Sequence, residues 1–229
     1  MNRRDFANRL ELAKALAETV ASDIAADIEA NGQATIAVSG GTTPAKFFAS
    51  LGKHREIAWE KVVITLVDER WVPETSDRSN ANLVNTTMLQ GPAATARFLP
   101  LYSGGTEPDE AAVRRTNEAL AGLPERFSAV VLGMGTDGHT ASFFPGGDTL
   151  EQAFTSEGPA LAIRAPGAGE PRITLTLPRL LKTRGLYLHI EGEEKAGVLD
   201  NALGEGPETD MPIRAVLRAD HPVTLFWCP

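Results

Sequence analysis

The segment Gly133 to Gly146, GMGTDGHTASFFPG, directly follows the apolar run Ala129 to Leu132. A short run of aliphatic and β-branched residues that ends at glycine is typical of a strand buried on both faces. We therefore expect the polar segment to leave the carboxyl end of a strand, which is where open α/β sheets bind their ligands. The segment also carries a carboxylate, Asp137, and an imidazole, His139. It predicts both an α/β fold and the position of a functional site.

The segment 133–146 also allows two simpler interpretations. Gly133 to Gly138 spells GxGxxG, the dinucleotide-binding fingerprint, which is weak evidence when it stands alone. The glycine and proline run at Pro145 to Gly147 cuts the following helix short, and no strand ending in Asp or Glu follows about 20 residues on, as a nicotinamide site requires. The other interpretation is a tight turn in which Asp137 caps a helix and His139 is solvated. The turn alone does not exclude it.

The composition is that of an ordinary globular protein, with 229 residues of which 42% are hydrophobic. This length suits one large α/β domain or two small ones and can bury a sizeable core. A formal net charge of −8 argues against general nucleic-acid binding, which needs a basic face. An anionic substrate would therefore need positive side chains placed locally in its site. The single cysteine, Cys228, excludes an intrachain disulfide.

The amino terminus predicts neither an export signal nor a membrane anchor. Its basic start, Met1 to Arg4, is followed by Asp5, Glu11 and Lys14, which interrupt any apolar stretch. No apolar run along the chain approaches the length that crosses a bilayer. We therefore expect a cytoplasmic protein with no membrane partner.

Strands and helices are expected to alternate along the chain, which is typical of α/β proteins. Apolar residues at three- and four-residue spacing predict a long helix from Phe6 to about Asn31. Strands are expected at residues 34–38, 62–67, 98–102, 129–132, 173–177, 186–190 and 223–227. Further helices are expected from Pro44 onward, at residues 83–89, 109–120 and 213–217, and after Gly192. The strand at 173–177 alternates apolar residues with threonine, so it is expected to be half-buried, and the stretch 146–171 is rich in Gly and Pro.

A glycine-rich loop, Ser39-Gly40-Gly41-Thr42-Thr43-Pro44, follows the first of these strands. Thr43 is a favourable N-cap and Pro44 a favourable first helical residue, so unpaired helix amides should point into the loop. Such a terminus binds anions, and glycines let the backbone approach a phosphate closely. The loop lacks the GK[ST] ending of a nucleotide P-loop. An ordinary strand-to-helix turn remains the alternative when the loop is considered alone.

Charged residues stand at other predicted strand ends. Asp68 and Arg70 follow the second strand, which favours their facing the same cleft as the glycine loop. Lys195 lies in the first turn of a predicted helix, where the helix dipole disfavours a cation, and this suggests an ammonium kept for an anion. Arg172 precedes another strand. His189 lies within a strand, where a packed or hydrogen-bonded structural role is expected.

Five segments of the chain resemble, in order and spacing, the 6-phosphogluconolactonases. They are AVSGGTTP (37–44), VDERWVP (67–73), SNANL (79–83), GMGTDGHTASFFPG (133–146) and GEEKAGVL (192–199). The resemblance covers nearly the whole chain. It implies a single domain over residues 1–229, with a three-layer αβα fold around a mostly parallel, Rossmann-like sheet. The related glucosamine-6-phosphate deaminases share the glycine loop, the Asp-Gly-His turn and the late lysine, but typically carry Asp-Glu-Tyr in place of Asp68-Glu69-Arg70.

The resemblance implies hydrolysis of 6-phospho-D-glucono-1,5-lactone to 6-phospho-D-gluconate, a step of the pentose phosphate pathway, with no cofactor or required metal. His139 is expected to be the general base that activates water, because imidazole titrates near neutrality. Asp137 would orient this imidazole or bind sugar hydroxyls, and Arg70 would bind phosphate or stabilise the developing oxyanion. The residues expected to hold the substrate are Ser39, Gly40, Gly41, Thr42, Asp68, Arg172 and Lys195.

The motifs are also compatible with other functions. A glucosamine-6-phosphate deaminase would share the phosphate site, but it would open the sugar ring and release ammonia. A non-catalytic sugar-phosphate sensor would not need His139, and no basic helix-turn-helix precedes the domain. A metal site is not expected, because one histidine and one carboxylate two residues apart do not make a three-ligand set. The expected partner is a small phosphosugar lactone, and the expected assembly is a monomer or homodimer.

Overall fold

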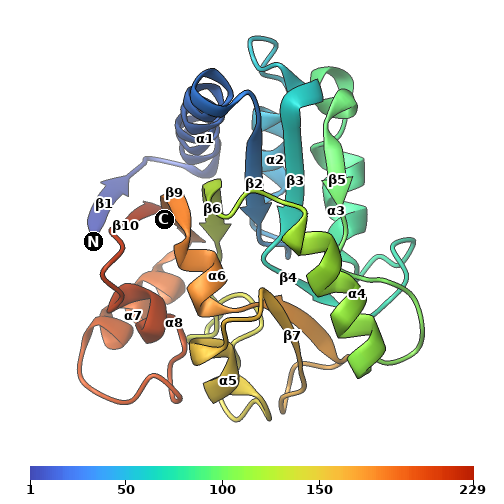
Figure 1. Ribbon diagram of the computed structural model, residues 1–229. Helices are drawn as coiled ribbons and strands as arrows, with labels where there is room; N and C mark the ends of the chain where they lie inside the picture. Colours follow the sequence, from blue (N-terminus) through green and yellow to red (C-terminus); the bar gives the residue numbers. More distant parts are fainter.

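A parallel sheet of seven strands runs through the centre of the computed structural model, which describes residues 1–229. The strands are β1 (Asn2–Asp5), β2 (Ala34–Val38), β3 (Val62–Leu66), β5 (Arg97–Leu99), β6 (Phe127–Leu132), β9 (Thr183–Glu191) and β10 (Val223–Cys228), in the spatial order β1-β10-β9-β6-β2-β3-β5. Every residue of β2 and β6 is buried, as expected for strands covered on both faces. The short first strand was not predicted. It pairs with β10 and brings both ends of the chain to one edge of the sheet (Figure 1).

Right-handed crossovers between parallel strands distribute the helices over both faces of the sheet. One face carries α1 (Arg9–Asn31), α2 (Ala45–Leu51) and α3 (Asn80–Thr87). Toward the other face lie α4 (Glu110–Ala121), α5 (Leu150–Thr155), α6 (Leu177–Leu181), α7 (Glu193–Leu203) and α8 (Ile213–Leu217) (Figure 1). The three-layer α/β architecture expected from the sequence is confirmed. No helix combines the length and the apolar character needed to cross a membrane.

The long helix α1 is bounded by capping residues at both ends. The side chain of Asn8 accepts the backbone N–H groups of Leu10 and Glu11, each at 3.0 Å. At the other end Gly32 adopts a left-handed conformation, with φ of 76°, which glycine tolerates without strain. The helix therefore ends where Asn31-Gly32 predicted, but it begins at Arg9, because Asn8 and not Phe6 provides the cap.

A second, antiparallel sheet stands at the carboxyl end of β3. It consists of β4 (Asp68–Arg70), β8 (Arg172–Leu175) and β7 (Ala160–Ile163). The prediction of a half-buried strand at 173–177 is wrong, because β8 is the central strand of this sheet and all of its residues are buried. The stretch 146–171, which is rich in Gly and Pro, contains α5 and β7. The residues around the cleft are thus held by two sheets.

Helix α3 is attached to β4 through the carboxylate of Glu69, which is fully buried. One carboxylate oxygen, Oε1, accepts the backbone N–H groups of Arg70 and Asn80, each at 2.8 Å. The other, Oε2, accepts the Ala81 N–H at 2.8 Å and the Ser79 hydroxyl at 3.0 Å. These bonds satisfy amides at the start of α3 that have no partner within the helix. They also fix the chain directions of β4 and α3 beside the cleft.

We expect Glu69→Gln to lower the free energy of unfolding by about 1–3 kcal/mol. Both carboxylate oxygens accept a backbone N–H, so the glutamine NH₂ would face a donor in either orientation. Urea unfolding followed by circular dichroism measures the change, and exposed Glu118→Gln is the matched control. Equal unfolding midpoints for the two variants would show that Glu69 does not hold α3.

Candidate functional site

A cleft opens where the carboxyl ends of β2, β3, β6 and β9 meet. Nine of the ten residues predicted from the sequence line it: Ser39, Gly40, Gly41, Thr42, Asp68, Arg70, His139, Arg172 and Lys195. The tenth, Asp137, lies behind His139 and is not part of the lining. Eight further residues complete the wall: Thr43, Pro44, Asn80, Gly133, Met134, Gly135, Ala141 and His189. The lining is strongly polar, as expected for a site that binds a charged, hydroxylated ligand.

His139 is held in one orientation by Asp137. The distance from His139 Nδ1 to Asp137 Oδ1 is 2.5 Å, and the same oxygen accepts the His139 backbone N–H at 3.0 Å. An ionised carboxylate only accepts, so Nδ1 carries the hydrogen of the neutral ring and Nε2 carries the free lone pair. No protein group is hydrogen-bonded to Nε2. The ring therefore presents a basic nitrogen to the cleft.

The Asp137 carboxyl stays ionised in this pair. Burial favours its protonated form, but the hydrogen bonds from His139 outweigh that effect and lower the pKa of Asp137 below its ordinary value. The His139 side chain is 31% exposed, so solvent reaches the ring. The orienting contact is thus a hydrogen bond from the imidazole to an ionised carboxylate.

The turn around His139 leaves no room for other side chains. A Cβ on Gly135 would lie 2.2 Å from His139 Nδ1 and 2.7 Å from Asp137 Oδ1, so only glycine fits there. The opposite side of the imidazole is covered by Phe144, whose ring centroid lies 4.2 Å away in a stacked arrangement. Ala141, with φ of 48°, is the one non-glycine residue with positive φ. Strain of this kind persists where the surrounding structure enforces it.

The glycine loop presents its backbone to the cleft at the start of α2. This helix begins at Ala45, one residue later than predicted. Pro44 occupies the cap position and its side chain has no acceptor, so Thr43 does not cap the helix as expected. A Cβ on Gly40 would lie 1.9 Å from Oδ1 of Asn80, a buried residue of α3. Glycine at position 40 therefore permits the loop to pack against α3 and leave its amides free for an anion.

Arg70 and Arg172 face each other across the antiparallel pair of β4 and β8. Like charges placed directly opposite in a sheet repel. The carboxylate of Asp68 lies close to Arg172, with 3.7 Å between Oδ2 and Nη1, and the same oxygen accepts the Ser142 hydroxyl at 2.5 Å. Burial lowers the pKa of the Arg172 guanidinium, an effect that Asp68 opposes and Arg70 reinforces. The Nε atoms of both arginines are buried without an acceptor. Both residues also line the cleft, so this corner of it carries positive charge that suits an anion.

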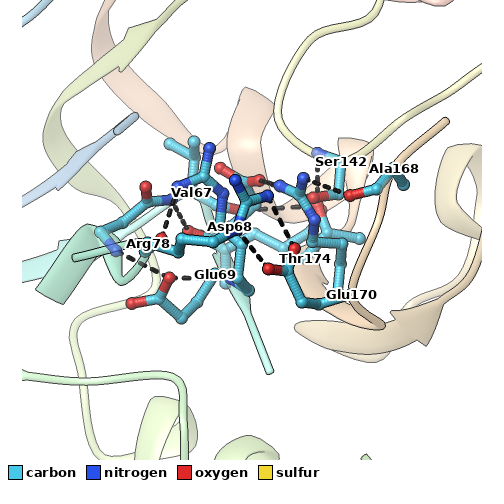
Figure 2. A network of polar contacts seen from close by, with 12 residues as sticks. Val67, Asp68, Glu69, Arg78, Ser142, Ala168, Glu170 and Thr174 are labelled. Carbon is cyan, nitrogen blue, oxygen red and sulfur yellow. Dashed lines mark hydrogen bonds and ion pairs between the residues drawn. The ribbon is translucent and has the colours of Figure 1, made fainter. Parts of the chain in front are cut away.

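Backbone and carboxylate groups outside the cleft hold the two arginines. The Arg78 carbonyl accepts Arg70 Nη1 at 2.5 Å, and the Ala168 carbonyl accepts Arg172 Nη2 at 2.8 Å. Arg78 is itself paired with Glu170, and this pairing lowers the pKa of Glu170 to about 2. Figure 2 shows the network, with Asp68 between Arg78 on one side and Ser142 and Ala168 on the other. Each guanidinium is thereby oriented by a backbone carbonyl eight or four residues away in the chain.

Lys195 lies in the first turn of α7, as predicted, together with the acidic residues Glu193 and Glu194. Burial lowers the pKa of the Lys195 ammonium, while the carboxylates of Glu191 and Glu194 counteract this effect. His189 stands beside it at the end of β9 and is 3% exposed. Its Nε2 lies 3.2 Å from Glu191 Oε1, and its ring packs edge-on against Phe47. The predicted packed and hydrogen-bonded state of His189 is correct, but the residue also lines the cleft.

The residues that the sequence did not identify as part of the site are Asn80 and His189, together with small and apolar wall residues. A signal for His189 was present in the alternation of β9, where Tyr187, His189 and Glu191 point to one face. No group of three or more His, Cys, Asp or Glu side chains is arranged to hold a metal ion.

The chain matches known proteins over nearly its full length. Residues 7–227 match the family model described as glucosamine-6-phosphate isomerases/6-phosphogluconolactonase. It is 50% identical to a 6-phosphogluconolactonase of Rhizobium meliloti, covering 98% of this chain and 97% of the relative. A 6-phosphogluconolactonase of Pseudomonas aeruginosa is 39% identical, over 96% of this chain and 91% of the relative.

Solved structures also match the chain over its full length. The crystal structure of a 6-phosphogluconolactonase from Shewanella baltica superposes with a TM-score of 0.97 at 40% identity, over 100% of this chain and 98% of that one. A monomeric glucosamine-6-phosphate deaminase shares the fold, with a TM-score of 0.78 at 17% identity over 100% and 97% of the two chains. The chain therefore belongs to the glucosamine-6-phosphate isomerase/6-phosphogluconolactonase family.

Proposed function

We propose that this protein is a 6-phosphogluconolactonase, which hydrolyses 6-phospho-D-glucono-1,5-lactone to 6-phospho-D-gluconate. The observation that carries the proposal is one cleft in which an oriented, unpartnered imidazole nitrogen faces a cluster of three cations and a glycine loop. The names of the relatives agree with it. The three cations are Arg70, Arg172 and Lys195. They supply the local positive charge that a protein of net charge −8 needs in order to bind an anion.

His139 acts as the general base through Nε2. It accepts a proton from water as the water oxygen bonds to the lactone carbonyl carbon, and the carbonyl oxygen becomes negative. The tetrahedral intermediate then breaks the bond to the ring oxygen, which takes the proton back from His139. Asp137 keeps the ring in the tautomer with Nδ1–H and stabilises the transient imidazolium. The products are a hydroxyl group and a carboxylic acid, which ionises and releases a proton.

The cations divide between the two ends of the substrate in this proposal. Lys195 and the loop from Ser39 to Thr42 hold the 6-phosphate, and Arg172 and Asp68 hold groups of the sugar acid. Arg70 stabilises the oxyanion, because a preorganised donor in a partly dry site interacts more strongly with developing charge than water does. The 6-phosphate lies far from the reacting carbon, so its binding energy positions that carbon for attack.

We further infer that residues 1–229 form one catalytic unit acting as a monomer or homodimer on a small phosphosugar lactone, with no nucleic-acid partner. We also infer that the enzyme acts in the cytoplasm, because a doubly charged sugar phosphate does not cross a membrane unaided. No step of the reaction calls for a cofactor.

The first experiment measures proton release after addition of freshly generated lactone to the wild type and to His139→Ala. We expect rapid acid release from the wild type and a loss of about 10²- to 10⁴-fold in kcat for the variant, because the general base is gone. Glucosamine 6-phosphate is tested in parallel for ammonia. Ammonia release without lactone hydrolysis would assign the chain to the deaminase branch of the family, and full activity of the variant would exclude His139 as the base.

Asp137→Asn tests the orienting role of the carboxylate. The amide removes the charge and permits the opposite tautomer of His139, and the corresponding change in serine proteases lowers kcat about 10⁴-fold. We expect a large fall in kcat with little change in KM, because Asp137 does not line the cleft. Exposed Asp200→Asn serves as the control. A rise in KM with kcat intact would indicate that Asp137 binds sugar hydroxyls.

Lys195→Met tests the phosphate end. We expect KM for the phosphorylated lactone to rise about 10- to 100-fold through loss of a charge-assisted hydrogen bond. Hydrolysis of glucono-1,5-lactone, which lacks the phosphate, should change little. Exposed Lys53→Met is the matched control. Equal losses on both lactones would mean that Lys195 does not contact the phosphate.

A further inference from the structure

His189 is a buried histidine in the cleft whose two nitrogens have different surroundings. Nε2 lies 3.2 Å from Glu191 Oε1, whereas Nδ1 has no hydrogen-bond partner in the protein. The residue is 3% exposed, and it lines the cleft beside Lys195 and the glycine loop. This nitrogen is not among the buried polar atoms that lack a partner, so it is accessible from the cleft that His189 lines. A ligand in the cleft can therefore form a hydrogen bond at Nδ1.

An ionised carboxylate stands on the Nε2 side of His189. Burial alone would raise the pKa of the Glu191 carboxyl, but its contacts with His189 and nearby cations outweigh burial and lower that pKa below its ordinary value. Glu191 is therefore an anion next to the imidazole, and it also pairs with Arg9 at 3.1 Å. The charged and titratable groups near this pair come from four packed elements: Arg9 of α1, Lys46 of α2, Glu194 and Lys195 of α7, and Cys228 of β10.

The hydrogen positions decide what Nδ1 can do. With Nε2–H donating to the carboxylate of Glu191, the neutral ring offers only a lone pair at Nδ1, and a phosphate dianion would repel it. The protonated ring offers Nδ1–H as a charged donor to the dianion. Protonation is then favoured from both sides, by Glu191 on one nitrogen and by the ligand on the other.

We propose that His189, backed by Glu191, is a second cationic ligand of the substrate phosphate, and that it takes up a proton when the phosphate binds. This assignment rests on the proposed function only in placing the phosphate at the Lys195 end of the cleft. His189 is a binding and specificity residue: it favours phosphorylated over unphosphorylated lactones and takes no part in the bond-breaking step.

Two substitutions distinguish the role of Nδ1 of His189 from the role of Nε2. In His189→Gln, the amide nitrogen replaces Nε2 and keeps the bond to Glu191, but the donor at the Nδ1 position is removed. In His189→Asn, the amide nitrogen replaces Nδ1 as a neutral donor and the bond to Glu191 is removed. A purely structural role through Glu191 predicts that glutamine is tolerated better than asparagine. Phosphate recognition through Nδ1 predicts the reverse order.

The experiment is calorimetric titration with 6-phosphogluconate and, separately, with inorganic phosphate. Each titration is run above pH 7, where the phosphate is mainly dianionic, in two buffers of different ionisation enthalpy. We expect the wild type to take up a fraction of a proton, at most about one, for each ligand bound. His189→Gln should bind about 10- to 100-fold more weakly with little proton uptake. His189→Asn should bind with intermediate affinity and equally little uptake.

Hydrolysis of the two lactones provides the activity readout. KM for the phosphorylated lactone should rise in His189→Gln while kcat and the hydrolysis of glucono-1,5-lactone stay near the wild-type values. The proposal is overturned by a wild type that binds without proton uptake, by glutamine binding better than asparagine, or by equal losses on both lactones. Proton uptake by the wild type tests the proposal even if neither variant folds. A wild type that binds phosphate with proton uptake but does not hydrolyse the lactone would refute the proposed function and leave the His189 assignment standing.

Discussion

The backbone of Val67 belongs to two sheets, and the cleft depends on this junction. Its N–H donates to the Val38 carbonyl of β2 at 3.0 Å, and its carbonyl accepts the Leu175 N–H at 2.8 Å. The chain therefore leaves the parallel sheet and enters the antiparallel one without an intervening loop. Because side chains alternate along a strand, Asp68 and Arg70 then point to one face and Glu69 to the other. One carboxylate anchors α3, while the neighbouring side chains line the cleft.

The same junction concentrates positive charge that the protein does not neutralise. The register of β4 and β8 places Arg70 opposite Arg172, and Asp68 forms an ion pair with Arg172. Two guanidinium nitrogens are buried without acceptors, and an unpaired buried donor costs about 1–3 kcal/mol. Both arginines line the cleft, where their charges would attract an anion. The network of Figure 2, including the Arg78–Glu170 pair, keeps the arginines from turning outward to solvent.

The two imidazoles in the cleft, His139 and His189, differ in which ring nitrogen contacts a carboxylate. Asp137 engages Nδ1 of His139 and leaves Nε2 for chemistry, on a ring that is partly open to water. Glu191 engages Nε2 of His189 and leaves Nδ1 toward the cleft, on a ring that is almost fully buried. The two imidazoles therefore present different ring nitrogens to the cleft. The difference lies in exposure and in which nitrogen is free.

Local sequence patterns were enough to predict the α/β class, most strands and helices, and nine of the residues that line the cleft. Apolar periodicity predicts the elements, and polar loops at the carboxyl ends of parallel strands must meet. The folded chain was needed to show that Arg172 faces Arg70, that Asp137 stands behind His139, and that His189 reaches the cleft. Strand register and side-chain direction depend on packing between segments far apart in the chain, and no local period encodes such contacts.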